Sequence, residues 1–128
     1  MALLLDTHAF LWWLAGDLQR SSAAATVIEK QTGAVFVSAA CVWEIATKYR
    51  IGKLPGIAAI ATDLDGAISR HGFQGLAVST RHGQMAGSMP GSHRDPFDRM
   101  LIAPAILENV SLVSNEVLFD SFGARRIW

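Results

Sequence analysis

The sequence predicts a single α/β domain in which a mostly parallel sheet of four to five strands carries helices on both faces. Two observations support this fold class. Short apolar runs alternate along the chain with longer segments of helical character, and most helical segments begin beside a capping residue or end beside a glycine. In addition, no linker, repeat or low-complexity run divides the 128 residues, so residues 1–128 are expected to form one domain.

The first elements follow from the N-terminal third of the chain. Residues 3–5 are three leucines ended by Asp6, which is typical of a short buried strand. Residues 9–14 then indicate a short helix that stops near Gly16. Either Ser21 or Ser22 can cap a second helix that continues to about residue 30.

The middle of the chain repeats this order. Residues 35–37 predict a second buried strand, and Ser38 can cap a helix over 39–51 that stops at Gly52. Residues 56–71 then have the periodicity of one amphipathic helix. Its apolar positions are Ile57, Ile60, Ala61, Leu64 and Ile68.

The last third supplies three further strands and one clear helix. Residues 76–78 predict a third strand, and the glycine-rich segment 83–94 is expected to be loop-like at its end. Residues 96–108 predict a helix, 111–113 a fourth strand and 126–128 a short fifth strand.

Four acidic residues are placed so that they can meet at one edge of this sheet. Asp6 directly follows the first strand, and Glu116 lies just past the fourth. Glu44 lies early in the helix after the second strand, and Asp98 lies at the start of the helix before the fourth. Because ligands of such folds bind beyond the carboxyl ends of the strands, the four acids are candidates for one site.

Three of these four acids also have a purely structural interpretation. Asp6 can simply cap the helix that follows it. Glu44 can form a surface ion pair with Lys48, four residues later. Asp95 is an obvious N-cap for the helix at residue 96, and the helix dipole favours Asp98 in its first turn. None of these residues therefore identifies a metal site by itself.

Convergence of the acids would require a counter-charge. Carboxylates about 5 Å apart repel one another by roughly 3 kcal/mol per pair at an effective dielectric near 20. Protonation or a bound cation must relieve that repulsion, and ligands that are all oxygen suit Mg²⁺ or Mn²⁺. The histidines show no zinc-like spacing with one another or with the single cysteine; they are His8, His71, His82 and His93.

Composition limits the class of protein. Eleven basic and eleven acidic residues give no net charge, which argues against a protein that coats nucleic acid nonspecifically. One cysteine, Cys41, and no apolar run near ~20 residues predict a cytoplasmic protein without a membrane span. Because 51% of the residues are hydrophobic, a partner or a second copy is expected to cover part of the surface.

Four segments carry a family resemblance that spans essentially the whole chain. They are, in order, LLLDTHAFLWWL, SAACVWEIATKYRIGKL, HRDPFDRMLIAPA and LVSNEVLF. In order and spacing they resemble PIN-domain ribonucleases, and above all the VapC toxins of bacterial VapBC toxin–antitoxin pairs. The resemblance implies a PIN-like fold with a central parallel sheet and an acidic cluster that binds Mg²⁺ or Mn²⁺.

The resemblance also assigns residues to that cluster. The family's acidic positions match Asp6, Glu44, Asp98 and Glu116. Thr7 and Ser114 match hydroxyl positions often found at the site, and Asp95 is placed to contact it through water. Two features depart from the family pattern or disturb it. The last acid is usually an aspartate, whereas here it is Glu116 preceded by Asn115, and Pro104 lies inside the predicted helix, where it is expected to cause a kink.

The activity implied is metal-assisted hydrolysis of RNA phosphodiester bonds. In that scheme Asp6 and Asp98 hold the first ion, Glu44 completes its ligand shell or acts as base, and Glu116 lies near a second ion. Basic residues that can contact phosphate, or can equally be ordinary solvated charges, are Arg94, Arg99, Lys48, Arg50 and Lys53.

The resemblance further implies partners. Toxins of this family are usually homodimers that a small cognate VapB-type antitoxin neutralises by packing over an apolar groove and the active site. Aromatic residues that can line such a groove, or can equally belong to the core, are Trp12, Trp13, Trp43 and Tyr49.

Two other functions remain open from the residues. A catalytically silent PIN-like module that binds RNA or protein is supported by the departure at Glu116. A phosphatase-like hydrolase with Asp6 as nucleophile is weakened by Asp6-Thr7-His8, which lacks the second aspartate that such enzymes place two residues later.

Overall fold

The computed structural model describes residues 2–16, 22–91 and 95–128. Its centre is a five-stranded sheet of order β3-β2-β1-β4-β5 in which every neighbouring pair is parallel. The strands are β1 (Leu3–Leu5), β2 (Val35–Ser38), β3 (Gln74–Leu76), β4 (Ser111–Val113) and β5 (Arg126–Ile127). The predicted parallel α/β fold is confirmed.

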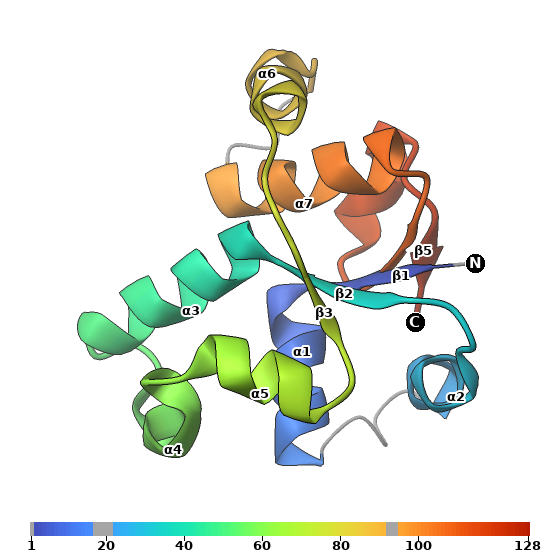
Figure 1. The fold of residues 1–128 in the computed structure, drawn as a ribbon. Coiled ribbons are helices and arrows are strands. Elements are labelled where there is room, and N and C mark those ends of the chain that lie inside the picture. Colours follow the sequence, from blue (N-terminus) through green and yellow to red (C-terminus); the bar gives the residue numbers. More distant parts are fainter. Residues whose placement is uncertain (1, 17–21, 92–94) are drawn as a thin grey trace.

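Helices lie on both sides of this sheet, with α6 and α7 above it and α1, α2 and α5 below it in Figure 1. The longer helices are α1 (Thr7–Ala15), α2 (Ser22–Lys30), α3 (Ala39–Arg50), α5 (Leu64–Arg70), α6 (Thr80–Ser88) and α7 (Pro96–Leu107). Shorter turns of helix are η2 (Pro55–Ile57), α4 (Ala58–Ala61) and η3 (Val117–Phe122). No helix in the described part of the chain is long and apolar enough to cross a membrane.

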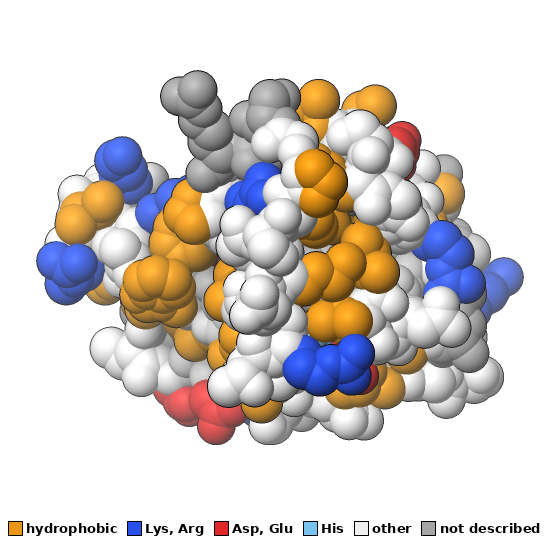
Figure 2. Space-filling model, turned by 90° about the horizontal axis from the view of Figure 1, so that it is seen from above, with side chains coloured by type: hydrophobic (Ala, Val, Ile, Leu, Met, Phe, Trp, Pro, Cys, Tyr) orange, Lys and Arg blue, Asp and Glu red, His pale blue; other side chains and the backbone are white. Residues whose placement is uncertain are grey.

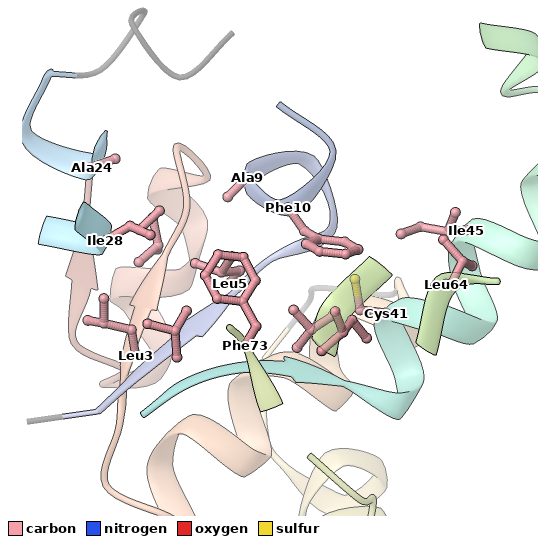
Figure 3. Close-up of a cluster of buried hydrophobic side chains, with 14 residues drawn as sticks. Leu3, Leu5, Ala9, Phe10, Ala24, Ile28, Cys41, Ile45, Leu64 and Phe73 are labelled. Carbon is pink, nitrogen blue, oxygen red and sulfur yellow. The ribbon is translucent and has the colours of Figure 1, made fainter. Parts of the chain in front are cut away.

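Alternation along β1 divides the core between the two faces of the sheet. Leu3 and Leu5 point to the face covered by α1, α2, α3 and α5, where they pack with Phe10 and Ile45 among others (Figure 3). Leu4 points to the opposite face and packs against Leu101 of α7. All three leucines of β1 are fully buried, because helices cover both faces of the sheet. This burial on both faces explains why the strand is a continuous apolar run.

Local signals place several element boundaries as expected. Asp6 and Ser38 each accept a hydrogen bond from the first turn of the helix they precede, and Gly16 ends α1 with a φ of 74°. The second predicted helix is present as α2, whereas Ser21, one of its two candidate caps, lies outside the described residues. Helix α7 runs without interruption through Pro104 to Leu107.

The prediction of one helix over residues 56–71 is wrong. The chain there forms η2, α4 and α5, with a break before α5. The break has a local cause, because the Asp63 side chain accepts a hydrogen bond from the Gly66 N–H at 2.9 Å and so starts a new helix.

Two further differences lie around the third strand. β3 begins at Gln74, two residues before the predicted strand, since it pairs with β2 from Phe36 to Ser38. Helix α6 covers residues 83–88, half of the glycine-rich segment 83–94, for which only a loop-like end was foreseen. It begins with a capping box in which Ser79 and His82 each bond to the other's backbone N–H.

Strand order positions the site. From β1 the chain moves to β2 and β3 on one side of the sheet, and then crosses back to β4 and β5 on the other. In such sheets a crevice forms beyond the carboxyl ends of the strands at the point where the order reverses. Here that point lies between β1 and β4.

Candidate functional site

A cavity of about 210 Å³ lies beyond the carboxyl ends of β1 and β4. Its lining residues are Asp6, Thr7, His8, Glu44, Lys48, Asp95, Asp98, Leu101, Asn115, Glu116 and Phe119. The structure therefore brings all four predicted acids, together with Thr7 and Asp95, to the wall of one cavity. Elements that are far apart in the sequence supply them: α1, α3, the start of α7 and the segment after β4.

Asp6 is buried at the start of α1, where it is 5% exposed. Its Oδ1 accepts a hydrogen bond from the Ala9 N–H at 2.7 Å, so the interpretation of Asp6 as an N-cap is correct. Burial raises the pKa of this carboxyl, although hydrogen bonds from Ser114 and Ala9 oppose the shift. Capping engages Asp6 without removing it from the cavity wall.

Glu44 is held by two partners. Its Oε1 accepts a hydrogen bond from the Thr7 hydroxyl at 2.5 Å, and its Oε2 lies 2.5 Å from the Lys48 ammonium. The ion pair that competed with a ligand role for Glu44 is therefore formed. Hydrogen bonding to Glu44 raises the pKa of Lys48, and the charges of Asp95 and Asp98 add to that effect.

The start of α7 supplies the next two acids. Asp95 is the N-cap, since its Oδ1 accepts a hydrogen bond from the Phe97 N–H at 2.9 Å, and Pro96 follows at the first helical position. Asp98 lies partly buried in the first turn, where the helix dipole favours a carboxylate. The rings of Trp43 and Phe97 meet edge to face, 4.9 Å apart, and this contact joins α3 to α7 beside Glu44 and Asp98.

Glu116 follows β4 and is partly exposed. The fully buried Ser114 hydroxyl accepts a hydrogen bond from the Glu116 N–H at 2.9 Å. One carboxylate oxygen of Glu116 accepts a hydrogen bond from the Leu118 N–H at 3.2 Å, so this residue caps η3. Sequence analysis did not foresee η3, and it therefore missed this structural role.

Of the candidate phosphate contacts, Lys48 lines the cavity. Arg99 instead ties α6 to α7, because its Nε donates to the Ala86 carbonyl at 2.7 Å and its Nη2 donates to the Met89 carbonyl. Arg94 lies outside the described residues, as does His93, and Arg50 and Lys53 are exposed. On the face seen in Figure 2, the described lysine and arginine side chains occur at several separate places and form no single continuous patch.

The predicted aromatic groove residues divide into two groups. Trp12 and Trp13 pack against the core: the Trp12 ring lies 5.3 Å from that of Trp128, and Trp13 Nε1 donates to His71 at 3.2 Å. Tyr49 is half-buried, whereas Trp43 is 61% exposed. Trp43 is therefore the most open of these four side chains to a partner.

The donor set suits Mg²⁺ or Mn²⁺ in chemistry, because carboxylate, hydroxyl and amide oxygens line the cavity. As they stand, however, no three acidic, histidine or cysteine side chains of the described segments lie close enough together to hold a metal ion. The contacts of Glu44 explain part of this separation, because both of its carboxylate oxygens are already bound, one to Thr7 and the other to Lys48. Binding would thus need side-chain rearrangement within the cavity.

Several lining residues were not singled out from the sequence as parts of the site. His8 is exposed and stacks on Trp12, with ring centroids 5.6 Å apart, and its charge lowers the pKa of Asp6. Leu101 and Phe119 bring apolar side chains to the wall, and Asn115 brings an amide. His8 and Asn115 had a signal in the sequence, namely their places beside Thr7 and Glu116.

Comparisons with known proteins identify the family and the fold. The PIN domain family model matches residues 3–124, so the chain belongs to the PIN-domain family. No curated protein sequence is significantly similar to the chain.

Solved structures of toxin–antitoxin systems share the fold. The chain is 17% identical to a chain of DNA-bound VapBC from Salmonella typhimurium, with a TM-score of 0.70 and coverage of 98% of this chain and 96% of that one. For VapBC2 from Rickettsia felis the identity is 18%, the TM-score 0.67 and the coverage 98% and 97%. For VapC20 of Mycobacterium tuberculosis, described as a Sarcin-Ricin loop cleaving toxin, these values are 18%, 0.61, and 95% of both chains. The fold is thus that of proteins in VapBC systems.

Proposed function

We propose that this chain is an Mg²⁺- or Mn²⁺-dependent endoribonuclease that acts as the toxin of a bacterial toxin–antitoxin pair. The observation that carries the proposal is the cavity at the β1/β4 edge, whose wall is lined by Asp6, Glu44, Asp98 and Glu116 in a chain of the PIN-domain family. A cavity lined by carboxylates attracts divalent cations and repels the phosphate backbone unless a cation intervenes.

Asp6 and Asp98 are the proposed principal metal ligands, with Glu44 as third ligand or base and Glu116 near a second ion. A bound divalent cation supplies charge stabilisation at the scissile phosphate and lowers the pKa of its water. Hydrogen bonds from the Ala9 N–H and from the Ser114 side chain hold the buried carboxylate of Asp6 in one orientation. The hydroxyls of Thr7 and Ser114 orient the neighbouring acids, and Asp95 acts through water.

Partners are proposed from the same comparisons. Two of the similar structures are VapBC complexes, which supports a cognate VapB-type antitoxin for this chain. A third is a toxin that cleaves the Sarcin-Ricin loop, which supports RNA as the substrate class. We expect a homodimer that acts in the cytoplasm.

The test is RNA cleavage by the purified chain with Mg²⁺ or Mn²⁺, with EDTA, and with the variants Asp6→Asn and Asp98→Asn. Cleavage should be lost in EDTA and should fall at least about a hundredfold in each variant, as expected for removal of a metal ligand. A matched control is Asp65→Asn, which changes an exposed aspartate of α5 outside the cavity. Metal-dependent cleavage that survives both cavity substitutions would contradict the site assignment.

A catalytically silent module is the second candidate. It is favoured by the engagement of Glu44 with Lys48 and of Glu116 with η3, and by the lack of a ready group of three ligands in the described segments. Calorimetric titration separates the two functions. A silent module retains affinity for RNA or the antitoxin and binds no Mn²⁺, whereas the nuclease binds Mn²⁺ through Asp6 and Asp98.

A further inference from the structure

Lys48 lines the cavity but has no role in the proposed reaction. Its ammonium lies 2.5 Å from Glu44 Oε2, and the side chain of Glu44 is only 7% exposed, against 35% for Lys48. The other carboxylate oxygen of Glu44 is taken by the Thr7 hydroxyl. Each oxygen of this buried carboxylate therefore already has a close partner.

The surroundings of Lys48 are acidic beyond this one pair. It lines the same cavity as Asp95 and Asp98, and both of these carboxylates act on its charge. Lys48 is also fixed to α3 one helical turn after Glu44, so its ammonium stays tethered beside the cavity even when the ion pair opens. It is thus a monovalent cation permanently attached to an acid-lined cavity.

We propose that Lys48 is the resident counter-cation of this cavity, and that a divalent ion gains Glu44 as a ligand only by displacing the Lys48 ammonium. The inference deepens the proposed function, since it rests on metal binding at the same acids.

Displacement follows from the geometry of Glu44. Because one oxygen faces Thr7 and the other faces Lys48, a metal that approaches Oε2 meets the ammonium in its path. Two cations cannot share so small a space without repulsion, since solvent screens charges poorly beside a buried carboxylate such as Glu44, whose side chain is 7% exposed. The ion pair therefore lowers the metal affinity that the acids would otherwise have. It also stabilises the buried Glu44 charge while no metal is present.

An ordinary surface ion pair would behave differently. Such pairs are solvated on both sides and contribute little, so removing the lysine would leave metal binding unchanged. Here the carboxylate is buried and belongs to the acid set, and removal of the ammonium frees a ligand oxygen. Metal affinity consequently distinguishes the two interpretations.

The experiment is calorimetric titration of the 128-residue chain with Mn²⁺ for the wild type, Lys48→Met and a control. Methionine keeps much of the apolar stem of lysine and removes only the charge. We expect Lys48→Met to bind Mn²⁺ about tenfold more tightly, the scale of a charge-assisted hydrogen bond. The matched control is Lys30→Met, at an exposed lysine of the last turn of α2, which should bind as the wild type does. Equal or weaker binding by Lys48→Met overturns the proposal.

Glu44→Gln, made in both backgrounds, tests whether the effect passes through Glu44. In the wild type the substitution should weaken Mn²⁺ binding little, because Lys48 already masks Glu44. In Lys48→Met the same substitution should cancel most of the tenfold gain. Equal losses of affinity in the two backgrounds contradict displacement.

Stability gives a readout that does not depend on nuclease activity. Lys48→Met leaves Glu44 without its ammonium, so its melting temperature in EDTA should fall and should rise more steeply with added Mn²⁺ than that of the wild type. If Lys48→Met does not fold in EDTA, Lys48→Gln replaces it, because the amide can still donate to Glu44 without carrying charge. A rise with Mn²⁺ no greater than that of the wild type overturns the proposal.

The failures of the two proposals are separable. RNA cleavage that needs metal and Asp98, together with unchanged Mn²⁺ affinity in Lys48→Met, refutes only the displacement. Tighter Mn²⁺ binding by Lys48→Met in a chain that cleaves no RNA refutes only the nuclease.

Discussion

Asp6 combines a folding role with a place in the acid-lined cavity. Its Oδ1 caps α1 through the Ala9 N–H, and its carboxyl lines the wall between β1 and β4. Burial opposes its ionisation and raises its pKa. The metal-free fold therefore carries a carboxylate that is unfavourably placed, a situation typical of functional sites.

Removing that charge should stabilise the metal-free protein. Asparagine is an equally good N-cap, so Asp6→Asn should raise the melting temperature in EDTA at pH 7.5 by a few degrees. The sign follows from linkage. The pKa of Asp6 in the folded protein lies above its unfolded value of 3.8. The contribution of this carboxyl to the stability of the fold is therefore fully present below pH 3.8 and is lost as the pH rises through the folded pKa. Scanning fluorimetry at pH 7.5 and near pH 3.8 measures this, and the gain should shrink at the lower pH. A variant that melts below the wild type at pH 7.5 would refute the account of Asp6.

Cys41 should be inert in the native state. Burial raises the pKa of its thiol to about 12, and the side chain lies in the core beside Ile45 (Figure 3). Only roughly one thiol in ten thousand is then ionised at pH 8, and access is closed as well. Labelling with a chromogenic disulfide reagent should therefore be slow in buffer and complete within minutes in guanidinium chloride. Rapid stoichiometric labelling of the native chain would show that Cys41 is accessible.

Individual residues were predictable where their roles are local. Asp95 as an N-cap and the pair of Glu44 with Lys48 both follow from spacing along one helix. The sequence does not reveal that this pair lies inside the cavity, because its position depends on how α3 packs against α7. Nor could it reveal the contacts of Arg99, which reach carbonyl groups at the end of a helix that was not foreseen.

At the scale of elements, caps explain both successes and errors. Gly16 ends α1 and Ser38 begins α3, as their residue types predict. Hydrophobic periodicity alone suggested one helix over residues 56–71, but the cap at Asp63 divides it. Helix α6 was not predicted, because glycine is a poor helix former and this segment contains several glycines. The stability of α6 comes instead from its packing against α7.

Ser38 offers a test of how α3 is positioned. It is fully buried at the end of β2, and its Oγ accepts a hydrogen bond from the Ala40 N–H at 3.0 Å. Ser38→Ala should lower the free energy of unfolding by about 1–2 kcal/mol, the usual loss for a helix cap. Urea unfolding followed by circular dichroism measures it. Ser69→Ala, at an exposed position of α5, should stay within about 0.5 kcal/mol of the wild type; equal losses in the two variants would deny Ser38 a capping role.

At the scale of the whole molecule, strand order creates the site. The alternation of short apolar runs with helical segments predicted four to five strands in a mostly parallel sheet, but not the order β3-β2-β1-β4-β5. That order is a tertiary property, and it brings β1 and β4 together although more than a hundred residues separate their starts. Family resemblance, in contrast, named the four acids that this order gathers.

Association with a second copy is expected from the surface. Among the residues that the structure describes, the large apolar side chains that remain exposed are Trp43, Ile51, Val117 and Leu118. Because exposed apolar area favours association, the purified chain should have twice its mass of 13.8 kDa in solution. Size-exclusion chromatography with light scattering measures this mass. A species of 13.8 kDa at all accessible concentrations would contradict the homodimer.

The most direct test of the central claim is the location of bound Mn²⁺ by anomalous diffraction from crystals of the wild type and of Asp98→Asn. We expect an anomalous peak in the cavity beside Asp6 and Asp98 in the wild type, and its loss in the variant. A cavity without Mn²⁺ in crystals of a protein that still cleaves RNA with metal, or a peak that persists in Asp98→Asn, would contradict it.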